Sequence, residues 1–213
     1  MTDIAIVDYG MGNLHSVSKA LEHVAPAATI AVTDDPEVVQ KAERVVVPGQ
    51  GAMPDCLREL DMRGLRQAVV DAAMSKPFLG ICIGLQMLFD SSEEGNVPGL
   101  GIVPGRVRRF PSAAMMDTHG QKLKVPHMGW NQVHQSVEHP LWKDIADDAR
   151  FYFVHSYYVE AASPVQAAGY SVYPFPFTCA VAKDNIFAVQ FHPEKSHEAG
   201  LTLLSNFVQW EPF

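Results

Sequence analysis

The segment of residues 77–89 places the strongest constraint on how this chain can fold. Its apolar residues at 78–81 predict the end of a buried strand, and those at 85–89 predict a helix that starts directly afterwards. Cys82 lies at the reversal between the two, with a glycine two residues away on each side. Glycine tolerates backbone angles that other residues avoid and lets neighbouring chain approach closely. The pattern therefore predicts a sharp turn that exposes Cys82 as a nucleophile, while a buried cysteine that only packs in the core is the alternative.

Strand-like and helix-like segments alternate along the first half of the chain. The predicted strands cover 4–7, 29–32, 45–47 and 78–81. One predicted helix ends near residue 24, a second starts near residue 35, and a third covers 65–74. Such alternation predicts a parallel sheet with helices on both faces. Ligand sites in such sheets lie at the carboxyl ends of the strands. We therefore expect Asn13, residues 49–51 and Cys82 to converge on one crevice.

The second half changes in character, because glycine and proline recur between residues 95 and 105 and short β-like segments follow. The predicted strands cover 107–110, 123–125, 131–134, 151–160, 166–172, 178–182 and 186–191, and a closing amphipathic helix covers 198–210. The predicted fold class is α/β, with a mostly parallel sheet covered by helices on both faces and an antiparallel β portion in the second half. No internal repeat or long linker divides the chain, so we expect one domain over residues 1–213.

The composition limits the cellular compartments and the classes of binding partner to be considered. A net charge of −8 at pH 7 argues against a general nucleic-acid-binding protein. Cys56, Cys82 and Cys179 are an odd count without Cys-x-x-Cys spacing, which argues against a disulfide framework and favours a reducing compartment. No signal peptide is visible, and no apolar run approaches the roughly 18 residues that a membrane span needs. We therefore expect a cytoplasmic protein.

A cysteine nucleophile needs a base for its proton and a third group that orients the base. His192 and Glu194 follow the predicted strand 186–191, and residues two apart in an extended segment project to the same side. A carboxylate beside the imidazole would fix its tautomer and stabilise its charged form. Metal binding by this pair with His197 is the alternative, but the ligand spacings of zinc deaminases and of zincins are missing. We therefore expect no metal site.

Two further features leave alternatives open. The Gly-x-Gly of residues 9–13 predicts close approach to another group, such as a phosphate, or only a tight turn, and the third glycine of the dinucleotide fingerprint is missing. His127 and His155 lie in apolar strand-like contexts, where they are interpreted either as satisfied structural histidines or as walls of a site.

Three motifs together resemble those of the class I, triad-type glutamine amidotransferases. They are Pro48-Gly49-Gln50-Gly51, Gly80-Ile81-Cys82-Ile83-Gly84-Leu85-Gln86 and His192-Pro193-Glu194, which span the chain in that family's order. Four further stretches resemble the glutaminase subunits of imidazole glycerol phosphate synthases, which act in histidine biosynthesis. These stretches are Tyr9-Gly10-Met11-Gly12-Asn13, Pro126-His127-Met128-Gly129-Trp130-Asn131, Tyr152-Phe153-Val154-His155-Ser156-Tyr157 and Lys195 after the triad.

The resemblance implies a glutaminase that works through a cysteinyl thioester. Cys82 would attack the side-chain amide of glutamine, His192 would pass the thiol proton to the departing ammonia, and Glu194 would orient His192. The oxyanion would be held by backbone N–H groups of Gln50, Gly51 and Ile83. The glutamine-binding positions would be Gly49, Gln86, Glu94, His155, Ser156 and Tyr157. The family usually carries Val where this chain has Gln50, but the chemistry should survive because the donor there is a backbone N–H.

The resemblance also implies a partner chain and no cofactor. The partner would be a (β/α)8-barrel cyclase that receives ammonia internally, and it must be a separate chain because 213 residues leave no room for a barrel of roughly 250 residues. Asn13, Tyr152 and Lys195 fall at positions that the family uses on this interface. The alternatives are a glutaminase of another synthase, such as the one of pyridoxal phosphate synthesis, and a stand-alone γ-glutamyl peptidase. An intact triad argues against a third alternative, a degenerate regulatory subunit.

Overall fold

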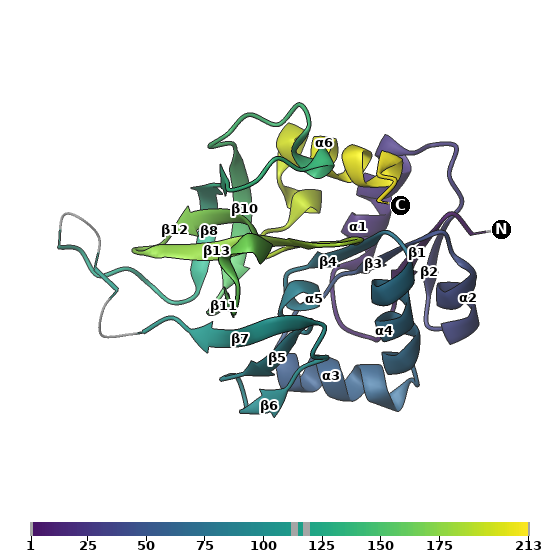
Figure 1. The fold of residues 1–213 in the computed structure, drawn as a ribbon, viewed down its shortest axis with the longest axis horizontal. Helices are drawn as coiled ribbons and strands as arrows, with labels where there is room; N and C mark the ends of the chain where they lie inside the picture. Colours follow the sequence, from purple (N-terminus) through teal and green to yellow (C-terminus); the bar gives the residue numbers. More distant parts are fainter. Residues whose placement is uncertain (1, 112–114, 117–119, 213) are drawn as a thin grey trace.

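The computed structural model describes residues 2–111, 115–116 and 120–212, and it joins a parallel β portion with helices to an antiparallel β portion (Figure 1). The helices are α1 (Leu14–Val24), α2 (Pro36–Lys41), α3 (Met53–Met62), α4 (Arg66–Ser75), α5 (Ile83–Gln86) and α6 (His197–Gln209), with 3-10 turns η1 (Pro140–Trp142), η2 (Pro164–Gln166) and η3 (Pro193–Lys195). No helix among these has the length and hydropathy that crossing a bilayer requires.

The strands follow the same order along the chain. They are β1 (Ile4–Val7), β2 (Ile30–Thr33), β3 (Arg44–Val47), β4 (Phe78–Ile81), β5 (Phe89–Ser92), β6 (Val97–Pro98), β7 (Val103–Arg109), β8 (His127–Gln132), β9 (His134–Gln135), β10 (Arg150–His155), β11 (Tyr157–Ala161), β12 (Ala167–Val172), β13 (Pro176–Lys183) and β14 (Ile186–Val189).

The parallel part of the main sheet has the strand order β2-β1-β3-β4-β14. α1 packs on α6 and α2 packs on α4, and the two pairs lie on opposite sides of these strands (Figure 1). Local signals start the helices: the side chain of Asp35 accepts the N–H of Glu37 at 2.9 Å, and Pro36 occupies the first turn of α2. The predicted parallel sheet with helices on both faces is confirmed.

The antiparallel part continues the same sheet through β13, β11 and β7, and β12 pairs with β13. β8 and β10 form a separate two-stranded sheet beside it, in which His127 pairs with His155. The prediction of an antiparallel portion in the second half is confirmed.

The single strand predicted over 151–160 is wrong, because the chain forms two strands with a break at Ser156. β10 pairs with β8, whereas β11 pairs with β7 and β13 in the main sheet. The carbonyl of Ser156 at the break accepts the N–H of Phe110 at 3.1 Å. The aromatic and β-branched pattern runs unbroken through both strands, so only the choice of different partners reveals the break.

Two other expectations are corrected, and one helix was not predicted. The helix expected at 85–89 is the single turn α5, because Phe89 already starts β5 and pairs with Val103. Residues 123–125, expected as a strand, are not in one, although the N–H of Leu123 donates to the carbonyl of Met115 at 2.8 Å. α3 was not among the predicted elements. Polar or charged residues dominate 55–66, but Met53, Cys56, Leu57 and Leu60 give this helix a buried face.

Close backbone contact fixes the turn between β4 and α5. A Cβ at Gly84 would lie 1.8 Å from the carbonyl oxygen of Val47 on β3, and one at Gly80 would lie 2.8 Å from the carbonyl oxygen of Gly84. Both neighbours are backbone atoms, which cannot move aside as a flexible side chain can. Only glycine at these positions lets the turn lie against the end of β3.

We predict that Gly84→Ala lowers the free energy of unfolding by about 3 kcal/mol, since the new methyl group overlaps the Val47 carbonyl and overpacks the sheet. Urea denaturation measures this loss. Gly64→Ala is the control, because a Cβ at Gly64 meets nothing within 4 Å and adds only the strain of its φ of +66°, about 1 kcal/mol. Equal losses in the two variants would contradict the steric account.

Candidate active site

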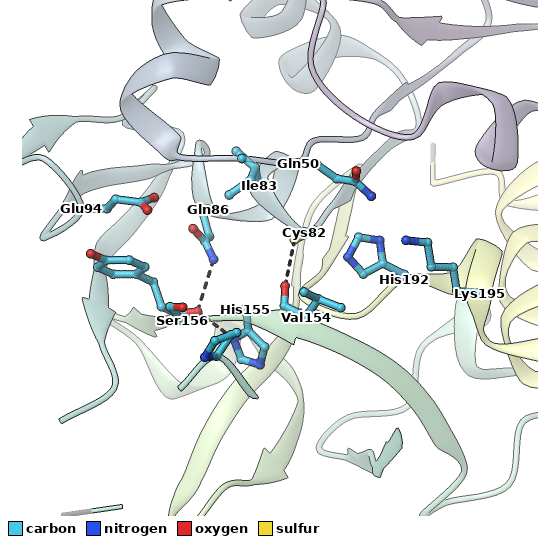
Figure 2. A pocket seen from close by; sticks show the side chains of 13 residues that line it. Gln50, Cys82, Ile83, Gln86, Glu94, Val154, His155, Ser156, His192 and Lys195 are labelled. Atoms are coloured by element: carbon cyan, nitrogen blue, oxygen red, sulfur yellow. Dashed lines mark hydrogen bonds between the residues drawn. The ribbon is translucent and has the colours of Figure 1, made fainter. Parts of the chain in front are cut away.

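A cavity of about 440 Å³ opens at the carboxyl ends of β3, β4 and β14, against the break between β10 and β11 (Figure 2). Its lining consists of Gln50, Gly51, Cys82, Ile83, Gln86, Glu94, Pro126, Val154, His155, Ser156, Tyr157, His192 and Lys195. Most of the site residues predicted from the sequence therefore meet in one place. Gly49, Glu194, Asn13 and Tyr152 are the predicted residues outside this lining.

Cys82 lies at the sharp turn that its flanking glycines predict. Its φ is +56°, a region that non-glycine residues rarely adopt, and its N–H donates to the carbonyl of Val189 at 2.8 Å. Backbone strain of this kind persists only where the surrounding structure enforces it, and it clusters at functional sites. The sulfur accepts the side-chain N–H of Gln190 at 3.6 Å and lies 3.9 Å from the carbonyl oxygen of Val154.

His192 and Glu194 form a buried pair beside Cys82. His192 Nδ1 lies 2.9 Å from Glu194 Oε1, and the two side chains are 4% and 1% exposed. Burial disfavours the charged imidazole, but Cys82 and Glu194 outweigh this penalty and raise the pKa of His192 to about 10. The pair is therefore suited to hold an imidazolium next to a thiolate. Figure 2 shows His192 beside Cys82, with Lys195 on its far side.

Backbone hydrogen bonds fix the position of His192. Its N–H donates to the carbonyl of Tyr152 at 2.9 Å, and the hydroxyl of Ser196 donates to its carbonyl at 2.6 Å. The same Ser196 hydroxyl accepts the N–H of Tyr152 at 3.0 Å. These bonds hold β10 and η3 together. β10 forms one wall of the cavity, and η3 carries Glu194.

Residues 49–51 run beside Cys82, as their place after a strand end predicts. Gly51 has a φ of +107°, and a Cβ at Gly49 would lie 2.8 Å from Ile83 Cβ. Within the residues that the structure describes, the N–H groups of Gln50 and Gly51 donate no hydrogen bond. Unpaired backbone donors next to a cavity are available to a ligand.

Polar groups converge on the other side of the cavity. The amide nitrogen of Gln86 donates to Gln190 Oε1 at 2.9 Å and to the carbonyl of Tyr157 at 3.3 Å, while its buried Oε1 has no partner in the described structure. Glu94 is half-buried, burial raises the pKa of its carboxyl group, and its Oε2 accepts the N–H of Met53 at 2.8 Å. Gln86 Oε1 is therefore an acceptor that a ligand can satisfy.

A pair of histidines supports this wall. Tyr157 O can only accept, so His155 Nδ1–H donates to it at 2.7 Å, and His155 Nε2 then accepts from His127 Nδ1–H at 2.9 Å. Burial lowers the pKa of His155 to about 3 and that of His127 to about 4, so both stay neutral near pH 7. His155 is thus both a satisfied structural histidine and part of the cavity wall, whereas His127 is structural.

The three positions predicted for a partner interface lie at the edges of this arrangement. Asn13 caps α1, where its side-chain oxygen accepts the N–H of Ser16 at 3.3 Å. Tyr152 is half-buried, and its ring makes an edge contact with Trp130 at 5.9 Å between ring centres. Lys195 lines the cavity.

Sequence reasoning missed three residues of the site. Pro126 and Val154 line the cavity, and Gln190 contacts both Cys82 and Gln86. Gln190 had a usable signal, since it is a polar residue within the apolar run 186–191. The other two are recognisable only once β8 and β10 are paired.

Comparison with known proteins supports the same interpretation. The family model of glutamine amidotransferase class-I matches residues 5–210. Imidazole glycerol phosphate synthase subunit HisH of Nitrosospira multiformis is 82% identical over 212 residues, with 100% of both chains covered. The protein of the same name from Neisseria meningitidis is 56% identical over 210 residues, covering 97% of this chain and 99% of that one.

The chain belongs to the class-I glutamine amidotransferases, and within them to the HisH subunits. As such it is a glutamine amidotransferase enzyme, and the alternatives from pyridoxal phosphate synthesis and γ-glutamyl peptide hydrolysis are not favoured. Solved structures agree on the fold of this amidotransferase. PurLQS from Thermotoga maritima has a TM-score of 0.68 at 18% identity, covering 98% of this chain and 99% of that one. A glutamine amidotransferase from the same organism has a TM-score of 0.62 at 15% identity, covering 91% and 76%.

We predict that iodoacetamide at pH 7 alkylates Cys82 and leaves Cys56 and Cys179 unmodified. Burial raises the pKa of Cys56 to about 12 and that of Cys179 well above its usual range, and both side chains are fully enclosed, whereas Cys82 lines the cavity. Peptide mass spectrometry reports the modified residue. A Cys82→Ala variant should take up no label, and labelling of Cys56 at a comparable rate would contradict the assignment.

We predict that Glu194→Gln lowers the kcat of glutamine hydrolysis by about 10²-fold or more with a nearly unchanged KM. A glutamine amide can donate to His192 Nδ1, which would place the imidazole proton on Nε2 and remove the base facing Cys82. Steady-state glutamate release separates the two constants. If KM rose steeply while kcat stayed constant, Glu194 would be a substrate-binding residue instead.

Proposed function

We propose that this chain hydrolyses glutamine to glutamate and ammonia, with Cys82 as nucleophile, His192 as base and acid, and Glu194 as the group that orients His192. The observation that carries the proposal is the buried His192–Glu194 pair beside Cys82, which lies at a strained turn in a cavity. The Cys82 sulfur attacks the side-chain amide carbon, and His192 holds the thiol proton. The C–N bond breaks, that proton leaves with the ammonia, and a glutamyl thioester remains, which water hydrolyses to glutamate.

The remaining cavity residues have supporting roles in this reaction. Backbone N–H groups of Gln50, Gly51 and Ile83 stabilise the oxyanion of the tetrahedral intermediates, where one lost donor typically costs about 10²–10³ in rate. The bound glutamine contacts Gly49, Gln86, Glu94, His155, Ser156 and Tyr157. The buried acceptor Gln86 Oε1 and the half-buried carboxyl of Glu94 support this, since glutamine brings an ammonium group that needs acceptors. The reaction uses groups of this chain alone, without a metal or cofactor.

We propose that the acceptor of the ammonia is a cyclase subunit, and a partner subunit is supported by the relatives' name, which makes them subunits of a synthase. We assign this partner to a separate (β/α)8-barrel chain that joins the ammonia to a phosphoribosyl-formimino carboxamide nucleotide. Asn13, Tyr152 and Lys195 face it. Large apolar side chains on β8 support docking here, because Met128 is 62% exposed and Trp130, which contacts Tyr152, is 37% exposed.

The cellular setting is part of the same proposal. A cytoplasmic location is supported by three cysteines that are all unpaired. A single domain is supported by one sheet that contains strands from both halves of the chain.

We further propose that the docked cyclase, loaded with its nucleotide, switches this subunit on. The flanking glycines lower the barrier for reorienting the peptide between Gly49 and Gln50. Docking then favours the orientation that completes the oxyanion hole. The shift in population is limited by the difference in the partner's affinity for the two orientations. Ammonia released without an acceptor would be lost to solvent, which is the physiological reason for such control.

The test compares glutamate release by the isolated subunit, by the complex, and by the complex with cyclase ligand. We expect the rate to rise in that order, and Cys82→Ala should abolish it in all three. Lys195→Ala should weaken either association or ligand stimulation, since the side chain lies between the triad and the surface. Equal rates in the three wild-type states would refute the gating, and activity in Cys82→Ala would refute the assigned nucleophile.

A further inference from the structure

Two buried donors outside the cavity lining contact the backbone of residues 48–50. The hydroxyl of Tyr9 donates to the carbonyl of Pro48 at 2.7 Å, and the thiol of Cys56 donates to the carbonyl of Gln50 at 3.5 Å. Tyr9 follows β1 and Cys56 belongs to α3, and both are fully buried. Neither residue has a role in the reaction as described above.

We propose that Tyr9 and Cys56 are positioning residues, a carbonyl clamp that holds the peptide units on either side of the Gly49–Gln50 peptide. Holding the Pro48 carbonyl fixes the peptide that carries the N–H of Gly49, and holding the Gln50 carbonyl fixes the one that carries the N–H of Gly51. Within the described residues the carbonyl of Gly49, between the two, accepts no hydrogen bond. The clamp therefore directs the Gly51 donor and confines rotation to the one peptide that presents the N–H of Gln50. This inference rests on the proposed function.

The donors of the clamp keep their protons under ordinary conditions. Burial and the neighbouring Cys56 hold the pKa of Tyr9 well above its usual value. Burial raises the pKa of Cys56 to about 12, although the Tyr9 hydroxyl opposes this shift. Each group therefore has a hydrogen to donate near neutral pH, and each carbonyl would lose a buried partner if that donor were removed.

Tight packing makes the clamp specific to this segment. A Cβ at Gly49 would lie 2.2 Å from the Tyr9 hydroxyl, and one at Gly51 would lie 2.8 Å from Met11 Cε. A Cβ at Gly12 would lie 3.5 Å from Gly49 Cα, so the loop of residues 9–13 lies directly on residues 49–51. The close approach that its glycines predict is therefore made to the chain's own oxyanion segment.

The experiment uses four variants in the complex with the cyclase subunit: Tyr9→Phe, Cys56→Ala, Cys56→Ser and, as the matched control, Cys179→Ala. Tyr9→Phe removes one oxygen, Cys56→Ser keeps a donor, and Cys179→Ala truncates an equally buried cysteine outside the site. The measurements are kcat and KM for glutamine hydrolysis, the melting temperature, and the rate at which iodoacetamide alkylates Cys82. Alkylation forms no oxyanion, so it reports on the thiol and imidazole alone.

We expect Tyr9→Phe and Cys56→Ala to lower kcat about tenfold, less than complete loss of an oxyanion donor costs. KM and the alkylation rate should stay within about twofold of wild type, Cys56→Ser should recover most of kcat, and Cys179→Ala should change only the melting temperature. The clamp is overturned if kcat of both variants stays within about twofold of wild type, if Cys56→Ser is as slow as Cys56→Ala, or if alkylation falls in parallel with kcat. Failure of the proposed function would give a different result. The wild-type complex would then either not hydrolyse glutamine or hydrolyse it equally well with Cys82→Ala.

Discussion

The contact between Gly84 and the carbonyl of Val47 is the constraint on which the site depends. Val47 ends β3 and leads into residues 48–51, while Gly84 belongs to the turn that follows Cys82. Because no Cβ fits between them, the backbone itself holds Cys82 and residues 49–51 at one spacing. Oxyanion stabilisation requires donors that are already in place when charge develops, and a contact between two rigid elements provides this better than mobile side chains would.

The electrostatics of the triad follow from its burial. A base with a pKa near 10 would be a poor proton donor if its surroundings stayed constant. They do not stay constant in the proposed reaction, because attack by Cys82 converts the thiolate into a neutral thioether-like sulfur. His192 then loses one of the two partners that stabilise its charge, while the burial penalty remains. Formation of the first bond therefore prepares His192 to release its proton to the leaving ammonia.

Burial of Glu194 serves the same step. Its Oε2 is buried without a hydrogen-bond partner in the described residues, so the side-chain hydrogen bond of this carboxyl group is the one between Oε1 and His192. Leaving a buried acceptor unpaired costs free energy. Functional sites commonly retain unfavourable burial of this kind, because a buried carboxylate shifts the pKa of the neighbouring group.

The sequence predicted the elements that local patterns of apolar residues and glycines determine. It did not predict the features that depend on which strands pair with each other. Apolar runs located β1, β3 and β4, their alternation with helices predicted a parallel sheet, and the glycines around Cys82 located the turn. The same patterns could not reveal that the chain changes sheets at Ser156, because β10 and β11 are equally rich in aromatic and β-branched residues. That break shapes the cavity, since it turns the backbone of residues 154–157 toward Cys82. The resemblance to a family predicted most of the lining, while Pro126 and Val154 were missed because their place in the cavity depends on how β8 and β10 pair.

The two unused cysteines show a further limit of such reasoning. The sequence assigned Cys56 and Cys179 no role in the site, and the fully buried Cys179 agrees with that. Cys56 differs only because α3 carries it beneath the carbonyl of Gln50. This arrangement also bears on the expectation that the chemistry survives with Gln at position 50. If the flanking carbonyls are held from the interior, the path of the segment is set by Tyr9, Cys56 and the two glycines. The side chain at position 50, which lines the cavity above His192 in Figure 2, then does not determine where its own N–H lies.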